Sequence, residues 1–254
     1  MSTAAINVHA QPFSANPGAR TGVLLCHGFT GSPASLRPWA DFLAGAGLRV
    51  ELPRLPGHGT RWQELELTEW TDWYRHVEQV CHRLDAECSQ VFVAGLSMGG
   101  ALALRLAEEH PVAGLMLVNP AIASDDISLR LLPHLPLVAG SQAAIGNDIA
   151  RPGADEHAYP RTPLRPARSM TKLWQLVRRD LGRVDCDLLL MTSRTDHVVD
   201  GATARLLRTR LGNQVTSLEL ARSHHVATLD HDAELIQQAS LDFINGRSAP
   251  DHAR

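Results

Sequence analysis

The sequence has little cysteine, no marked excess of either charge and no long apolar run, and each absence excludes a class of protein. Its four cysteines form no C-x-x-C pair, so we expect them all to be reduced thiols (Cys26, Cys81, Cys88 and Cys186). The formal net charge is −3, from 24 Lys and Arg against 27 Asp and Glu, and no run of like charges stands out. This balance gives no reason to expect binding to nucleic acid or to an anionic membrane.

The sequence also lacks the signatures of a membrane span and of a secretory signal. No apolar stretch approaches the roughly 20 residues that a transmembrane helix needs. Residues 1–7 do not have the basic start and apolar core of a signal peptide. We therefore expect a cytoplasmic protein, a monomer or a homodimer, that acts on a small uncharged molecule.

What is present is an alternation of strand and helix patterns along 254 residues, a length that suits a single domain (1–254). Apolar strand patterns occur at 22–26, 48–52, 91–96, 114–119, 186–193 and 215–220, with a possible edge strand at 11–14. Apolar residues with helical spacing occur at 35–46, 70–84, 98–109, 202–211 and 232–245. The alternation predicts an α/β fold, in which a mostly parallel sheet has helices on both faces and ligands bind at the carboxyl ends of the strands.

Residues 121–184 interrupt this alternation, because prolines recur there and no strand pattern is visible. We expect short helical pieces such as 169–179, and we interpret the segment as an insertion that crosses the top of the sheet. It is more apolar than a surface loop needs to be (Ile122, Ile127, Leu129, Leu131, Leu132, Leu135, Leu137, Val138 and Ile145). These residues either pack the insertion onto the body or line an acyl pocket, and the sequence does not assign them to one role or the other.

The most informative motif is Gly95-Leu96-Ser97-Met98-Gly99, which lies between an apolar strand pattern and a helical one. A serine in such a sharp turn has a strained backbone, and the flanking glycines leave room where a Cβ would collide. The turn exposes the Ser97 hydroxyl as a nucleophile. The N–H of Met98, at the start of the helix, is free to face an oxygen above that serine.

A nucleophilic serine needs a base and an acid, which in such a sheet come from later strand ends, the acid first. Asp196 is the first carboxylate after the 186–193 strand, and Asp200 is a rival whose position suits a helix cap instead. Asp125 and Asp126, after the preceding strand, are further rivals.

The base should come from the paired histidines after the last strand, His224 and His225, which spacing alone does not separate. We expect other histidines, including His58, His82, His197 and His231, to be mostly solvated. The backbone N–H of Phe29, after the first strong strand, is the candidate for a second oxyanion donor.

Five segments of the chain (24–32, 55–60, 94–100, 192–199 and 223–230) resemble those of α/β-hydrolases, and more narrowly of small bacterial carboxylesterases and monoacylglycerol lipases. In that group the histidine segment usually reads Ser-Gly-His-Val, which aligns His225 with the base and puts His224 in the place of the glycine. The resemblance also implies that the N–H groups of Phe29 and Met98 hold the oxyanion. It further implies that no cofactor is needed and that residues 121–184 form a small cap over an acyl tunnel. We find no metal-ligand cluster in the sequence.

These residues predict a serine hydrolase that cleaves carboxylic esters of short to medium acyl length, possibly monoacylglycerols, through an acyl-enzyme. The same triad could instead serve acyl transfer or cleavage of a carbon–carbon bond. A non-catalytic ligand-binding protein on the same fold is a third interpretation. Dehalogenase and epoxide hydrolase chemistry is disfavoured, because enzymes of those classes carry Asp where this sequence has Ser97.

Overall fold

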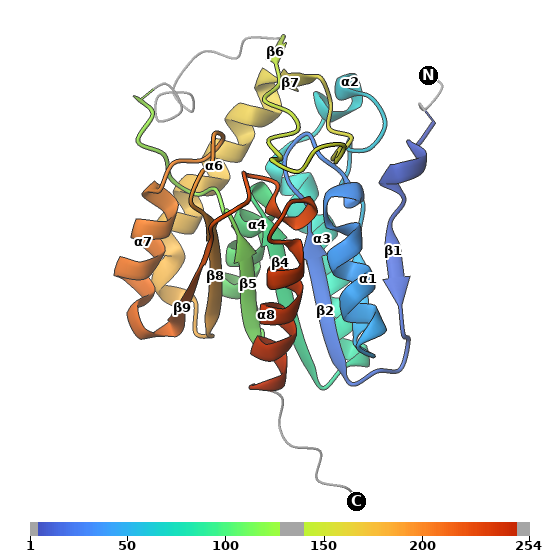
Figure 1. Cartoon of the computed structure of the whole chain (residues 1–254), viewed down its shortest axis with the longest axis vertical. Coiled ribbons are helices and arrows are strands. Elements are labelled where there is room, and N and C mark those ends of the chain that lie inside the picture. Colours follow the sequence, from blue (N-terminus) through green and yellow to red (C-terminus); the bar gives the residue numbers. More distant parts are fainter. Residues whose placement is uncertain (1–4, 128–139, 248–254) are drawn as a thin grey trace, which may run out of the picture.

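The computed structural model describes residues 5–127 and 140–247, which are built around one seven-stranded sheet (Figure 1). The strand order is β1-β3-β2-β4-β5-β8-β9, and every pairing is parallel except that of β1 with β3. The strands are β1 (Phe13–Ala15), β2 (Thr21–Cys26), β3 (Arg49–Leu52), β4 (Gln90–Leu96), β5 (Gly114–Val118), β8 (Leu188–Ser193) and β9 (Val215–Leu220). The predicted sheet is confirmed, and the edge strand lies one or two residues later than expected.

Helices cover both faces of the sheet, as predicted. One face is covered by α1 (Arg37–Gly45) and α8 (Ala233–Asn245), which lie in front of the strands in Figure 1. The other face is covered by α3 (Trp70–Glu87), α4 (Met98–Glu109), α6 (Leu164–Asp180) and α7 (Ala202–Leu211). Each face has its own apolar cluster, so the sheet separates two cores.

Strand β2 illustrates how the sequence builds these two cores. Its side chains point alternately to the two faces, so Leu24 packs into one cluster while Val23 and Leu25 pack into the other. All three are fully buried. An uninterrupted apolar run is therefore required in a central parallel strand, and that run is what the sequence shows.

The segment between β5 and β8 differs from the prediction in one respect, because it contains two strands where none was expected. β6 (Ser141–Ala143) pairs antiparallel with β7 (Arg161–Pro163), and this ribbon lies beyond the carboxyl ends of the main strands (Figure 1). Each strand has only three residues and β7 ends in proline, so neither shows an apolar alternation in the sequence.

The second half of the same segment belongs to the helical layer. Helix α6 is longer than the expected 169–179 piece, and its Leu173 and Val177 are fully buried in the cluster that also contains α3 and α4. Of the apolar residues noted above, Ile122 is buried, whereas Ile127 and Ile145 are exposed. The remaining ones lie outside the described residues (Leu129, Leu131, Leu132, Leu135, Leu137 and Val138).

Two further expectations concern the composition. All four cysteines are unpaired. Within residues 5–127 and 140–247, no helix has both the length and the apolar character that crossing a bilayer requires.

Candidate active site

Ser97 occupies a strained turn between β4 and α4. Its φ of 55° and ψ of −117° lie where non-glycine residues are rarely found. A Cβ on Gly99 would be 1.9 Å from the carbonyl oxygen of Cys26, and one on Gly95 would be 2.4 Å from the backbone of Gly99. Gly99 is thus required by the close approach of the turn to β2, and Gly95 by the close approach of the start of α4.

The backbone of Ser97 is held on both sides. Its N–H donates to the carbonyl of Val118 at the end of β5 (3.0 Å), and its carbonyl accepts the N–H groups of Gly100 (2.9 Å) and Ala121 (3.2 Å). Helix α4 begins at Met98, whose N–H has no acceptor within the helix. The strained turn is fixed to the neighbouring strand, which keeps the serine in place.

His225 and Asp196 are brought together from two loops that follow β9 and β8. His225 Nδ1 and Asp196 Oδ2 are 2.8 Å apart, and the two side chains are only 7% and 6% exposed. The other oxygen of Asp196 accepts the N–H groups of Val198 and Val199, both at 2.8 Å. The carboxylate is therefore fixed by its own loop while it holds the imidazole.

The rival carboxylates have other partners. Asp200 accepts the N–H of Ala202 at the start of α7 (2.8 Å), close to the cap role expected for it, and also the Ser124 hydroxyl. Asp125 is exposed and pairs with Arg205. Of the candidates weighed from the sequence, Asp196 is the one that forms an ion pair with His225.

Ser97 and His225 line the same cavity, whose volume is about 200 Å³. Phe29 also lines it, whereas Met98 is fully buried at the start of α4. Most of the wall is apolar and comes from the strand-end loops and from residues 143–174 (Leu96, Ala121, Ala143, Ile145, Met170, Trp174, Val198, Val199 and Val226). An apolar cavity with a serine and a histidine on its wall suits a substrate that has a hydrocarbon part and a reactive polar group.

Among the described residues, Glu156 is the one acidic side chain on the wall of this cavity, and it was not predicted from the sequence. Its Oε1 accepts the N–H of Asn147 at 3.0 Å. Burial raises the pKa of this carboxyl above its ordinary value, an effect that the Asn147 N–H and the nearby His225 only partly offset. No sequence signal marks Glu156, since its place depends on how the loop between β6 and β7 folds back.

Asp148, from the same loop, was also missed. Its Oδ2 accepts the backbone N–H of both His197 and His225, each at 3.1 Å, and its Oδ1 is 2.7 Å from His197 Nδ1. Burial raises the pKa of this carboxyl, but the hydrogen bonds from His197 and His225 outweigh it and hold the pKa below its usual value. One carboxylate thus ties the loop that carries Asp196 to the loop that carries His225.

Asn119 performs a similar function beneath His225. Its side-chain amide donates to the carbonyl of His225 (2.8 Å) and to the hydroxyl of Ser193 (2.9 Å), and its carbonyl accepts the N–H of Ser193 (2.8 Å). Since Asn119 directly follows β5 and Ser193 is the last residue of β8, the histidine loop is anchored to the end of the sheet.

His224 is not among the residues that line the cavity. Its N–H donates to the buried Asp230 (2.9 Å), and its ring packs edge-on against His197, with centroids 4.6 Å apart. The extra imidazole therefore does not crowd Ser97.

Three of the four histidines named in the sequence analysis follow the expectation. His82, His197 and His231 are exposed, but His58 is completely buried, so the prediction that it is solvated was wrong. Its ring packs against His27 and Trp73, and burial holds its pKa well below the ordinary value. The reason is that the His58 side chain points inward from the loop at 55–60, where it also packs edge-on against Phe29.

Within residues 5–127 and 140–247, the structure also brings together side chains that could act as metal ligands, which the sequence did not indicate. Two groups of three side chains each place their ligand atoms within 4.8 Å of one another. One consists of Asp148, His197 and His224, and the other of Glu78, His82 and His110. Neither group is contiguous in sequence, which is why spacing did not reveal them.

Comparison with known proteins places the chain in a family. A profile of the alpha/beta hydrolase family matches residues 23–238. A thermostable monoacylglycerol lipase from a Bacillus species is 40% identical over 239 residues, which cover 92% of this chain and 94% of that protein. A carboxylesterase from Bacillus subtilis is 26% identical, covering 93% and 97%. A solved structure from work on LipS and LipT, two metagenome-derived lipolytic enzymes, has 38% identity and a TM-score of 0.90, and the match covers 95% of this chain and all of that one. The chain therefore belongs to the alpha/beta hydrolase family.

Proposed function

We propose that this protein is a serine hydrolase of carboxylic esters, in which Ser97 is the nucleophile, His225 the base and Asp196 the acid that orients it. The observation that carries the proposal is the pairing of His225 with Asp196 on the wall of a cavity that also contains the strained Ser97. The kinship with a monoacylglycerol lipase and a carboxylesterase agrees with this chemistry.

The reaction follows from the atoms involved. The Nδ1 of His225 is bonded to Asp196, so its Nε2 can accept the proton of Ser97 as the serine oxygen attacks the ester carbonyl. The N–H groups of Met98 and Phe29 would stabilise the oxyanion that forms, a contribution of about 2.7 to 4 kcal/mol for one donor. His225 then protonates the leaving alcohol, and water that it activates releases the acid from the acyl-serine.

Within the ester class, we propose a monoacylglycerol of short to medium chain as the substrate. The apolar wall of the cavity suits the acyl chain, and the Glu156 carboxylate can accept hydrogen bonds from the free hydroxyls of a glycerol group. This substrate is also the one named for the 40% identical relative, a monoacylglycerol lipase. The cytoplasmic location and the oligomeric state expected from the sequence stay predictions.

The primary test is the Ser97→Ala variant, assayed with p-nitrophenyl esters. Because attack needs the hydroxyl, we expect turnover to fall at least about 1,000-fold while circular dichroism and the unfolding temperature stay close to those of the wild type. Activity near the wild-type level would refute the assignment of Ser97.

The substrate proposal needs a separate comparison. A monoacylglycerol and a p-nitrophenyl ester with the same acyl chain differ only in the alcohol, so Glu156→Gln should lower kcat/KM for the first about 10-fold and leave the second nearly unchanged. Equal losses of kcat/KM on both substrates would show that Glu156 does not bind the glycerol group. Adding competing alcohols and analysing the products would reveal acyl transfer, the alternative that uses the same acyl-serine.

A further inference from the structure

We propose that Glu78, His82 and His110 form a binding site for a divalent transition-metal ion of the Zn²⁺ type, which links α3 to the end of α4. The site is separate from the cavity that contains Ser97 and forms no part of the proposed ester hydrolysis.

The three side chains come from two well-anchored elements. Glu78 and His82 are four residues apart on α3, so they lie one turn apart on the same face of that helix. His110 caps the end of α4, where its N–H donates to the carbonyl of Leu106 (2.8 Å) and Pro111 follows it. Both backbones are thus fixed before any ion binds.

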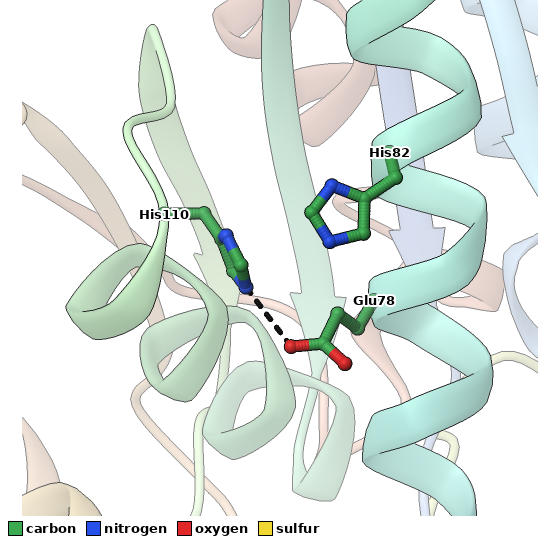
Figure 2. A group of neighbouring side chains, drawn as sticks. All are labelled: Glu78, His82 and His110. Atoms are coloured by element: carbon green, nitrogen blue, oxygen red, sulfur yellow. Dashed lines mark hydrogen bonds and ion pairs between the residues drawn. The ribbon is translucent and has the colours of Figure 1, made fainter.

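Figure 2 shows the three side chains converging on one space between α3 and His110. His110 Nε2 lies 3.0 Å from Glu78 Oε1, and the rings of His82 and His110 are nearly perpendicular, with centroids 4.8 Å apart. All three ligand atoms lie within 4.8 Å of one another. Around a tetrahedral Zn²⁺ with bonds of about 2.1 Å, ligand atoms are separated by about 3.4 Å. Side-chain shifts of about 1 Å would therefore complete the geometry.

The exposure of the group suits an ion that enters from solvent. Glu78 and His110 are partly exposed, at 29% and 26% of their side chains, and His82 is exposed. The protein supplies three ligands, so water can occupy the fourth position. Two imidazoles and one carboxylate favour Zn²⁺, Co²⁺, Ni²⁺ or Cu²⁺ over Mg²⁺ and Ca²⁺, which prefer oxygen ligands alone.

The neighbouring thiol and cation do not interfere. Cys81 lies next to His82, but its side chain is buried in the apolar cluster on this face of the sheet, whereas His82 is exposed. Arg105, on the last turns of α4, forms ion pairs with Glu108 and Asp180. These two carboxylates largely neutralise the Arg105 charge, so it should repel a bound cation only weakly.

The other three-residue group is a weaker candidate. Asp148 already accepts two backbone N–H groups and contacts His197, so its carboxylate is committed to holding the loops of the cavity. Glu78, in contrast, has His110 as its hydrogen-bond partner, and His110 is itself one of the three proposed ligands.

An ion bound by Glu78, His82 and His110 would crosslink α3 and the end of α4. Helix α4 has 12 residues, so its end lies about 18 Å along the axis from Ser97 at its start. Bound metal would fasten that end to the middle of α3 and stabilise the folded chain by mass action, because the unfolded chain holds the three ligands apart.

The test is a Zn²⁺ titration of the full chain without a polyhistidine tag, in a His197→Gln background that removes one ligand of the other group. We expect saturable binding of one ion per chain and a rise in the unfolding temperature with Zn²⁺ but not with Mg²⁺. Adding His82→Gln should weaken the affinity at least about 100-fold and abolish the rise. Adding His231→Gln, which removes another exposed histidine, should change neither.

Glu78→Gln provides a second variant that keeps both imidazoles, and it should weaken binding at least about 10-fold. Circular dichroism of each variant checks the fold. The proposal is wrong if the His197→Gln protein shows no saturable Zn²⁺ binding. It is equally wrong if His82→Gln and His231→Gln have the same affinity.

Discussion

At the scale of single residues, the chemistry of the site depends on which of two adjacent histidines faces the cavity. His225 lines it and pairs with Asp196, whereas His224 packs against His197 and donates its N–H to Asp230. The two adjacent side chains thus have different neighbours, and His225 is the one on the cavity wall with Ser97.

This difference gives the first prediction. His225→Gln should lower kcat for p-nitrophenyl esters by at least about 1,000-fold, because the serine loses its base. His224→Gln keeps the backbone N–H that binds Asp230 and should lower kcat less than about 10-fold. Steady-state kinetics of the two variants decides the matter, and the reverse order would assign the base to His224.

Asp148 gives the second prediction, as a positioning residue. Replacing it by Asn removes the negative charge that strengthens the bonds from the N–H groups of His197 and His225, and it changes one of the two oxygens to an amide NH₂, so the two loops should loosen. We expect kcat to fall about 10-fold with little change in KM. His197→Gln is the matched control, since it removes the side-chain contact but keeps both backbone bonds. A loss in the control as large as that in Asp148→Asn would attribute the effect to the His197 side chain.

The sequence was sufficient for the residues that sit at strand ends. Ser97, Asp196 and the pair His224 and His225 follow β4, β8 and β9 in the chain order expected of this fold. Position alone did not separate the two histidines, and the resemblance to known esterases selected His225 as the candidate. Asp148 and Glu156 could not be found in this way. They belong to a loop between two three-residue strands, and their contacts to the site arise from tertiary folding alone.

At the scale of elements, the turn from β4 into α4 shows how closely packing specifies sequence. The backbone of Gly99 lies against the end of β2, at the carbonyl of Cys26. That approach places the start of α4 beside the loop that carries Phe29, and it leaves no room for any side chain at position 99.

The third prediction concerns this contact. Gly99→Ala would put a Cβ 1.9 Å from the Cys26 carbonyl oxygen, so strand and helix would have to separate. We expect a loss of about 3 kcal/mol or more in the free energy of unfolding, together with loss of activity. Gly45→Ala, at the last residue of α1 with no atom near its added methyl, should be neutral or slightly stabilising. Chemical denaturation measures both, and similar stabilities for the two variants would contradict the argument.

The burial of an element decided whether the sequence could predict it. Strands β2, β4 and β5 are buried on both faces and were visible as apolar runs, and α7 and β9 were placed at their observed bounds. The ribbon of β6 and β7 was not visible, because only one of its six residues is buried and the sequence therefore shows no apolar alternation there.

At the scale of the whole molecule, buried histidines couple the stability of the fold to pH. His27 follows β2 and is fully buried, with Nδ1 3.0 Å from the carbonyl of Gly28 and Nε2 accepting the N–H of Leu55 (3.2 Å). This pattern fits the neutral ring with its proton on Nδ1. Burial lowers the pKa of His27 to about 4 and holds that of His58, which packs against it, well below the ordinary value.

The fourth prediction follows from the sign of these shifts. Both histidines have a lower pKa in the folded chain than the ordinary 6.5 expected after unfolding, so the unfolded chain binds more protons as the pH falls. Their contribution to stability is complete above about pH 6.5 and declines from there down to the folded pKa, which is about 4 for His27. Between pH 6.5 and pH 5, His27 alone should cost about 2 kcal/mol, at 1.36 kcal/mol for each pH unit.

Urea denaturation at pH 8 and pH 5 tests this prediction in the wild type, in His27→Gln and in His231→Gln. His27→Gln should be less stable at pH 8, because it disturbs a packed and bonded ring, yet it should lose less stability between the two pH values than the wild type does. His231 is exposed, so its variant should keep the wild-type difference. If His27→Gln and the wild type lost the same free energy of unfolding, the acid sensitivity of the fold would have to come from groups other than His27.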